Sequence, residues 1–257
     1  MNKNGVVDFS TFRSSCQFCG LSQICLSADQ SGNEIKDLNQ IVHRNRKIEH
    51  GDYLFREDDP FNHVYAIHTG SIKTCSITEN GNEYVTGFHL PGELMGLNAI
   101  STGIHTESAI ALETSSVCEI PFERLESLAK SNPDIQHLLL MAMSEEIQND
   151  HNQLAMISRM SAEVRLASFL LSLSCHLQQR GYSATEFNLS LSRSDIASLL
   201  GLAVETISRL ISRFQREGLI TVNRKYFALH DLESLKKMAP KCSSLPYPGY
   251  SLSNKAS

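Results

Sequence analysis

The stretch from Ser192 to Arg209 constrains the fold most, because its residue types fit two short helices joined by a tight turn. Ala197 is small at the point where two such helices would cross, and Gly201 stands where the turn needs a left-handed residue. Val204 and Ile207 are spaced to face inward from the second helix. We therefore predict a helix-turn-helix unit with helices near 193–200 and 204–217.

The outward face of the second predicted helix carries Glu205, Ser208 and Arg209 near its N-terminal end, the part of such a helix that enters a DNA major groove. Arg209 can grip guanine with two hydrogen bonds, Glu205 can accept one from cytosine, and Ser208 can contact a base or a phosphate. The alternative is an ordinary helical hairpin, in which Glu205 and Arg209 only form an ion pair one turn apart.

A β-hairpin is expected directly after these helices, with strands at 219–222 and 226–229, and it favours the DNA-binding interpretation. Its tip would present Arg224 where a wing meets the phosphate backbone. A short helix near 231–238 completes the unit. We predict a winged helix-turn-helix that contacts DNA through Glu205, Ser208, Arg209, Arg213 and Arg224.

The charge of the chain divides in a way that agrees with a basic DNA-binding end. The net charge is -5 over 257 residues, but residues 1–158 hold 10 Lys and Arg against 21 Asp and Glu, while residues 159–257 hold 13 against 7. The N-terminus does not resemble a secretory signal, and no stretch is long and apolar enough to cross a membrane. We therefore expect a cytoplasmic protein.

Residues 51–120 alternate short apolar stretches with turn signals, a pattern typical of an all-β roll or barrel. The clearest pair of strands, 72–78 and 83–90, is joined by a turn containing Asn80 and Gly81, since Asn-Gly supplies the positive φ angles that a tight hairpin needs. A short helix near 122–130 follows. The sequence therefore predicts an α+β protein with the β-rich part first.

Pro133 opens a long helical pattern, at a position where a helix tolerates proline. Apolar residues and one acid recur along it at alternating steps of three and four, which is the spacing of a coiled-coil seam. The seam residues are Leu140, Met143, Ile147, Asp150, Leu154 and Ile157. They predict a dimer interface; the alternative is an amphipathic helix packed only on its own domain. A further helix is expected over 161–180, and a short strand over 188–191.

Three cysteines, Cys16, Cys19 and Cys25, lie close together near the N-terminus. In a reducing compartment such spacing points to metal or redox chemistry rather than disulfides. Three thiolates are one short of a tetrahedral zinc site or a four-cysteine iron-sulfur cluster, and spacing does not separate the two. Candidates for the fourth ligand are Cys75, Cys118, Cys175 and Cys242.

Enzymatic motifs are missing from the sequence. It contains no phosphate-binding loop, no nucleophile elbow and no HExxH motif, and its ten histidines are scattered. We therefore expect a regulator and not an enzyme.

Four separated motifs together resemble the oxygen-sensing fumarate and nitrate reduction regulators, a branch of the cyclic-AMP receptor protein superfamily. They are the cysteine triad, Gly-Phe-His-Leu-Pro-Gly-Glu-Leu at 87–94, Leu-Glu-Thr-Ser-Ser-Val-Cys-Glu-Ile-Pro-Phe-Glu at 112–123 and Gly-Leu-Ala-Val-Glu-Thr-Ile-Ser-Arg at 201–209. The resemblance covers roughly residues 14–238.

This resemblance implies a ligand set of Cys16, Cys19, Cys25 and Cys118 for one 4Fe-4S cluster per subunit. Cys75 and Cys175 are then interpreted as buried thiols, and Cys242 as incidental. The resemblance also implies an oxygen-responsive global transcription regulator. Without oxygen its dimer would bind promoter DNA with TTGAT-like half-sites and contact RNA polymerase, and oxygen would degrade the cluster and separate the subunits.

The resemblance and the composition of the C-terminus imply five parts of the chain, in an α+β fold. They are an N-terminal cluster-binding segment (1–28), a β-roll like a cyclic-nucleotide-binding domain (29–132), a dimerisation helix (133–158), a winged helix-turn-helix (159–239) and a tail (240–257). The tail lies outside the resemblance and is expected to be disordered because it is rich in Ser and Pro.

Most of the superfamily holds a cyclic nucleotide in the roll, clamping its phosphate with a glutamate and an arginine-serine pair. The corresponding positions here are Leu97 and Glu107-Ser108. A carboxylate in place of the arginine repels a phosphate, so we expect no cyclic nucleotide ligand.

The predicted seam contains its own switch. In a parallel pair of helices Asp150 would lie near its symmetry mate, and like charges there oppose association by roughly 1 to 4 kcal/mol. Burial of Ile147 would return about 1.5 to 3 kcal/mol per side chain. Our hypothesis is that the intact cluster holds the N-terminal segment against the roll and the start of the helix, and tilts this balance toward the dimer.

Overall fold

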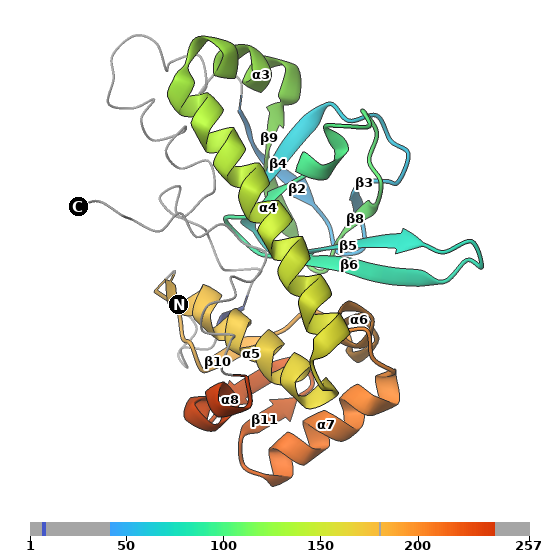
Figure 1. Cartoon of the computed structure of the whole chain (residues 1–257), viewed down its shortest axis with the longest axis vertical. Coiled ribbons are helices and arrows are strands. Elements are labelled where there is room, and N and C mark those ends of the chain that lie inside the picture. The colour runs from blue at the N-terminus through green and yellow to red at the C-terminus, as the bar shows by residue number, and fades with distance from the viewer. Residues whose placement is uncertain (1–6, 9–41, 180, 240–257) are drawn as a thin grey trace.

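The computed structural model describes residues 7–8, 42–179 and 181–239. Within these ranges the chain has the predicted α+β fold, with a β-roll, one long helix and a C-terminal winged helix-turn-helix (Figure 1). The proposed tail at 240–257 and the proposed cluster-binding segment, apart from residues 7–8, lie outside the described residues.

The roll consists of two four-stranded sheets. One has the order β2 (His43–Ile48), β9 (Ser115–Pro121), β4 (His63–Thr69) and β7 (Leu94–Met95); the other has the order β3 (Tyr53–Phe55), β8 (Ser108–Ala111), β5 (Ile72–Ile77) and β6 (Glu83–His89). The short 3-10 helix η2 (Leu97–Ala99) follows β7. The predicted hairpin joins β5 and β6, and Gly81 has a φ of 78° in its turn, but Asn80 does not share the positive φ expected of it.

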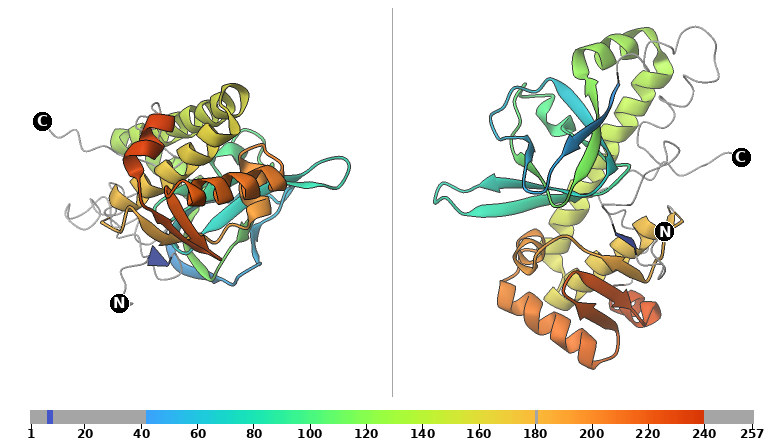
Figure 2. Two further views of the ribbon diagram at one scale, coloured as in Figure 1. Left: turned by 90° about the horizontal axis from the view of Figure 1, so that it is seen from below. Right: turned by 180° about the vertical axis from the view of Figure 1, so that it is seen from behind.

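Two helices follow the roll, α3 (Phe122–Ser131) and α4 (Pro133–Arg159). The side chain of Asn132 accepts hydrogen bonds from the backbone N–H groups of Asp134 and Ile135, which fixes the start of α4 directly before Pro133. Ile135 and Ala142 of α4 pack on an apolar cluster of the roll that includes Val64. The helix runs along the roll and reaches the winged unit at its far end (Figures 1 and 2).

The C-terminal unit combines four helices and a small sheet. Its elements are α5 (Ala162–Gln179), β10 (Glu186–Asn188), α6 (Arg193–Leu199), α7 (Val204–Arg216), β11 (Ile220–Asn223), β12 (Tyr226–Leu229) and α8 (Leu232–Met238). Strand β1 (Val7–Asp8) joins this sheet, parallel to β10.

The short strand expected at 188–191 is wrong in position, since β10 spans 186–188. Pairing with β12 sets its limits, because Phe187 lies opposite Phe227 with the rings stacked at 6.0 Å between centroids. Leu189 and Leu191 are buried in the core after the strand ends. Burial of these residues, rather than sheet pairing, accounts for the apolar pattern that suggested the strand.

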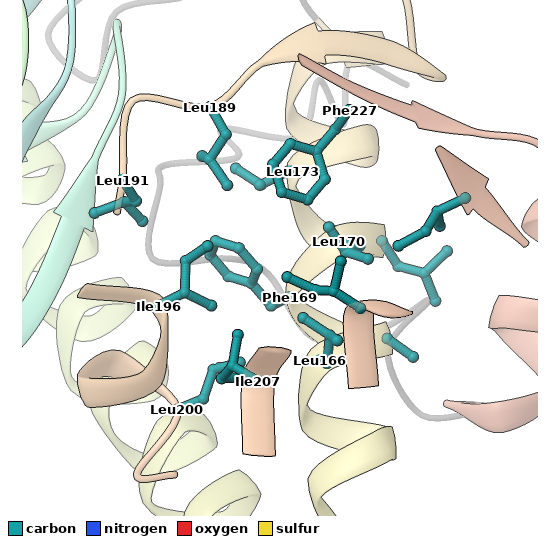
Figure 3. Packing of buried hydrophobic residues seen from close by; sticks show 14 of the residues in the cluster. Leu166, Phe169, Leu170, Leu173, Leu189, Leu191, Ile196, Leu200, Ile207 and Phe227 are labelled. Atoms are coloured by element: carbon teal, nitrogen blue, oxygen red, sulfur yellow. The ribbon is translucent and has the colours of Figure 1, made fainter. Parts of the chain in front are cut away.

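One apolar core holds the winged unit together and continues into the roll. Leu166, Phe169 and Leu170 of α5 pack against residues of α6, α7 and β12 (Figure 3). The same cluster includes Val85 and Phe88 of β6. The winged unit therefore packs directly on the roll hairpin.

Candidate nucleic-acid interface, dimer seam and metal ligands

The start of the helix-turn-helix is fixed by a reciprocal cap. The Ser192 hydroxyl accepts a hydrogen bond from the Asp195 backbone N–H at 3.0 Å, and the Ser192 N–H donates to Asp195 Oδ2 at 3.0 Å. Gly201 adopts the left-handed conformation that the turn needs, with a φ of 61°. The two predicted helices and their turn are confirmed.

The second helix, α7, separates an apolar face from a charged one. Ile207, Leu210, Ile211 and Phe214 are buried in the winged-unit core. The prediction that Val204 faces inward is wrong, since this first residue of α7 is exposed. Glu205 and Arg209 are exposed near the N-terminal end, and Ser208 is half-buried. Among the described side chains no ion pair joins Glu205 to Arg209, so both groups face solvent rather than each other. Contact of these side chains with base edges stays a prediction.

Arg213 has a different environment from Arg209. Its guanidinium pairs with Glu217 on its own helix at 2.7 Å and with Glu163 on α5. These carboxylates raise its pKa above the ordinary value, hydrogen bonding to Glu217 being the main cause. A DNA contact through Arg213 stays a prediction, and it would require exchange of these ion pairs for a phosphate.

The wing is formed by β11 and β12, with Arg224 at its tip. Arg224 is exposed and has a φ of 56° in the tight turn that joins Asn223 to Tyr226. Gln215 of α7 accepts a hydrogen bond from the Val222 N–H at 2.9 Å. This bond fixes the position of the wing relative to α7.

The long helix α4 has one apolar face against the roll and another toward solvent. Its buried residues Ile135, Ala142 and Asn149 recur every seven positions. The predicted seam residues Leu140, Ile147 and Leu154, also seven apart, are 59%, 56% and 66% exposed. Met143 and Asp150 are exposed too, whereas Ile157 is half-buried beside Gly201. Such a row of exposed apolar side chains is typical of a surface that pairs with another molecule.

Three carboxylates lie close together beside the seam, and the sequence indicated only Asp150. Burial raises the pKa of Glu146 to about 7, with further contributions from Asp150 and from Glu107 of the roll. Partial desolvation also raises the pKa of Asp150, although its side chain is exposed, with a contribution from Glu107. Glu107 is distant in sequence, so no local pattern could have revealed this cluster.

Of the four predicted metal ligands, the structure describes only Cys118. It lies on β9 opposite Ala66 of β4, half-buried against the apolar cluster that also contains Ile135 at the start of α4. Cys16, Cys19 and Cys25 lie outside the described residues, as does Cys242. Among the described side chains, no group of three His, Cys, Asp or Glu is arranged to hold a metal ion.

The two remaining cysteines differ from each other. Cys75 is buried, as expected, and burial raises the pKa of its thiol to about 11. The expectation that Cys175 is buried is wrong, since it is exposed on α5. Helix α5 is buried on nearly all sides, from Leu166 to Ser174 and again at His176 and Leu177, and Cys175 interrupts this buried stretch near the end of the helix.

The chain matches two known domain families and several known regulators. Residues 45–132 match the cyclic nucleotide-binding domain, and residues 164–238 match the Crp-like helix-turn-helix domain. The chain is 44% identical to the fumarate and nitrate reduction regulatory protein of Shigella dysenteriae, over 87% of this chain and 90% of that protein. The chain belongs to the family of fumarate and nitrate reduction regulators.

Two further similarities agree with this family. The transcriptional activator protein anr of Pseudomonas aeruginosa is 44% identical over 87% of this chain and 91% of that protein. The structure of FixK2 from Bradyrhizobium japonicum aligns with a TM-score of 0.69 and 26% identity, covering 76% of this chain and 96% of that one. The chain is thus a DNA-binding transcription regulator of the anaerobic type and not an enzyme.

The roll of this family member differs at the positions that clamp a cyclic phosphate in the wider superfamily. Leu97 is buried. Glu107 accepts hydrogen bonds from Asn98 Nδ2 at 2.9 Å and from the Thr86 hydroxyl, and Ser108 accepts one from the Glu57 N–H at 3.0 Å. The Glu107 carboxylate is thus held in place by two neutral donors, and the absence of a cyclic nucleotide ligand stays a prediction.

No described helix combines the length and the apolar character needed to cross a lipid bilayer.

Proposed function

We propose that this protein is an oxygen-responsive switch of transcription in the cytoplasm, in which ligation of Cys118 controls the pairing of two α4 helices. Cys16, Cys19, Cys25 and Cys118 would hold one 4Fe-4S cluster per subunit. When bound, this group supplies sensitivity to oxygen, which degrades it and so removes the tie between the N-terminal segment and the roll.

The position of Cys118 is the observation that supports this proposal. Its half-buried side chain packs with the same apolar cluster as Ile135 and Ala142, the residues through which α4 contacts the roll. Cysteine thiolates are the soft ligands that hold iron-sulfur clusters, and Cys118 lies half-buried beside the apolar cluster that receives the start of α4. A link made at Cys118 would thus act on the seating of α4.

The pairing itself is the task of the α4 seam. Burial of Leu140, Ile147 and Leu154 against a second copy would favour the dimer, since each exposed apolar side chain contributes about 1.5 to 3 kcal/mol when it is fully buried. Asp150 opposes this gain through repulsion of its symmetry mate. A small change in how α4 is held can therefore decide the balance.

The dimer would place two α7 helices on a palindromic promoter. Glu205, Ser208 and Arg209 would read TTGAT-like half-sites, and Arg224 would contact phosphates at the wing. A monomer with a single helix-turn-helix loses the second half-site, and with it most of the affinity. RNA polymerase is the partner expected at the bound promoter.

Purification without oxygen, followed by exposure to air, tests this function. We expect a brown protein with iron and sulfide close to four atoms each per subunit, a dimer by sedimentation and tight binding to a palindromic duplex. In air the colour, the dimer and the binding should disappear together. A colourless zinc protein, or a dimer indifferent to air, would contradict the proposal.

The expected lack of a cyclic nucleotide response follows from Glu107. Titration with cyclic AMP under the same conditions should leave DNA affinity and unfolding temperature unchanged. A response to cyclic AMP at micromolar concentration would contradict this expectation.

A further inference from the structure

A single side chain at the start of α5 binds the ends of two other helices. The guanidinium of Arg165 donates to the backbone carbonyls of Ile157 and Met160 at the end of α4, the latter at 3.0 Å. It also donates to the carbonyls of Leu200 and Gly201 at 3.0 and 3.3 Å. These two residues form the turn of the helix-turn-helix.

Both sets of carbonyls are groups that helix ends leave without helical partners. The C-terminal end of a helix also carries partial negative charge, so a cation is favourable at the C-terminal ends of both α4 and α6. Arg165 serves the C-terminal ends of α4 and α6 at once, because the planar guanidinium directs several N–H groups to different sides. The side chain therefore links two elements that are about 40 residues apart.

Packing around the guanidinium leaves little freedom between these elements. A Cβ added to Gly201 would lie 3.4 Å from Ile157 Cγ2 and 3.5 Å from Arg165 Nη1, so the turn is in contact with the last turn of α4. The recognition helix α7 begins at Val204, shortly after this turn. A rotation of the turn relative to α4 would thus move α7 by a similar angle.

We propose that Arg165 is the positioning residue that fixes the direction of α7 relative to α4, and thereby sets the half-site spacing that the protein accepts. The inference rests on the proposed function in one respect, the pairing of two α4 helices on one palindrome. In such a dimer the two-fold axis lies along the α4 pair, so the angle between α4 and α7 determines the separation of the two recognition helices.

Lysine at this position separates the geometric role from the charge. Arg165→Lys keeps the positive charge and most of the aliphatic stem, but a single ammonium does not reach carbonyls on two helices in the same arrangement. The matched control is Arg124→Lys on α3. Arg124 is exposed, and α3 packs at the other end of α4 (Figure 1).

The test measures DNA binding by the full chain in oxygen-free buffer. The probes are duplexes with two TTGAT-like half-sites at the preferred spacing, and at one base pair more or fewer, together with a duplex that holds one half-site. Each base pair rotates one half-site by roughly 35° against the other, since about 10.5 base pairs make a turn. Sedimentation and thermal unfolding are recorded for each variant.

For the unmodified protein and Arg124→Lys we expect strong discrimination between spacings. For Arg165→Lys we expect about tenfold weaker binding at the preferred spacing and little difference between spacings, with half-site affinity and dimerisation unchanged. If Arg165 only stabilised the fold, Arg165→Lys would lower the unfolding temperature and leave the spacing preference intact. That result would overturn the proposal.

Failure of the inference and failure of the proposed function give different results. If the unmodified protein does not dimerise or shows no spacing preference, the proposed pairing is wrong. If it does both and Arg165→Lys behaves identically, only the role of Arg165 is wrong. If Arg165→Lys unfolds, Arg165→Gln, which retains amide donors on a shorter stem, takes its place under the same criteria.

Discussion

Two helices of this protein present side chains to other molecules, and they do so in opposite ways. Helix α7 buries Ile207, Leu210 and Phe214 and exposes charged groups. Helix α4 buries one apolar row on the roll and leaves a second row, with Leu140 and Leu154, in solvent. The charged face of α7 is well solvated in the single chain. The exposed apolar row of α4 costs free energy in water, and contact with a second copy would remove that cost.

Because the two helices differ in this way, substitutions near α4 should affect dimerisation, while substitutions in α7 should affect DNA recognition. The largest expected effect comes from Cys118→Ala. Loss of this ligand should abolish iron retention, dimerisation and DNA binding without oxygen, although α7 is untouched. Iron analysis and sedimentation measure the effect, with Cys175→Ser, at an exposed cysteine of α5, as the control. Full DNA binding by Cys118→Ala would remove this residue from the ligand set.

Asp150→Ala should strengthen pairing by about 1 to 4 kcal/mol, because it removes a pair of like charges from the seam. Analytical ultracentrifugation in air should then show a dimer. Asp134→Ala, in the first turn of α4 and away from the seam, is the matched control. An unchanged monomer for Asp150→Ala would mean that charge repulsion does not hold the subunits apart.

Arg209→Ala tests α7 alone. It should cost about 1 to 3 kcal/mol in affinity and relax the preference at one base pair of the half-site, with dimerisation unchanged. Arg224→Ala should instead weaken all sequences alike and reduce the salt dependence of binding. Binding assays on single-base variants of the half-site distinguish these outcomes. Equal losses of affinity on every sequence for Arg209→Ala would mean that Arg209 contacts the DNA phosphates and not a base.

The smallest expected effect is the pH response of Glu146. Because its pKa is raised from 4.5 to about 7, the folded chain binds this proton more tightly than the unfolded chain. The stabilisation is therefore present at low pH and is lost as pH rises through 7. Between pH 6 and 8 this group should lower the free energy of unfolding by about 1 kcal/mol. Glu146→Gln lacks the carboxyl group, so its free energy of unfolding should fall less over the same range. Identical pH profiles would show that Glu146 is not buried beside other acids.

Much of the fold could be predicted because it depends on local patterns. The Asn-Gly turn between β5 and β6, the proline at the start of α4 and the glycine between α6 and α7 each act on their immediate neighbours, and the structure confirms all three. The strand expected at 188–191 was misplaced, since its limits depend on pairing with β12. The burial of Cys175 was misjudged for a similar reason, because the sequence does not say where along α5 its packing neighbours leave a side chain exposed.

The sequence by itself determined the elements, their order, the charged face of α7 and the spacing of the α4 seam, because these follow from backbone periodicity and from residues close in the chain. Tertiary structure decided which apolar row of α4 is exposed, that Glu107 lies beside Glu146 and Asp150, and that Arg165 joins two helix ends. Electrostatic and hydrogen-bond energies depend on distance in space, and folding sets that distance between residues that the sequence keeps far apart.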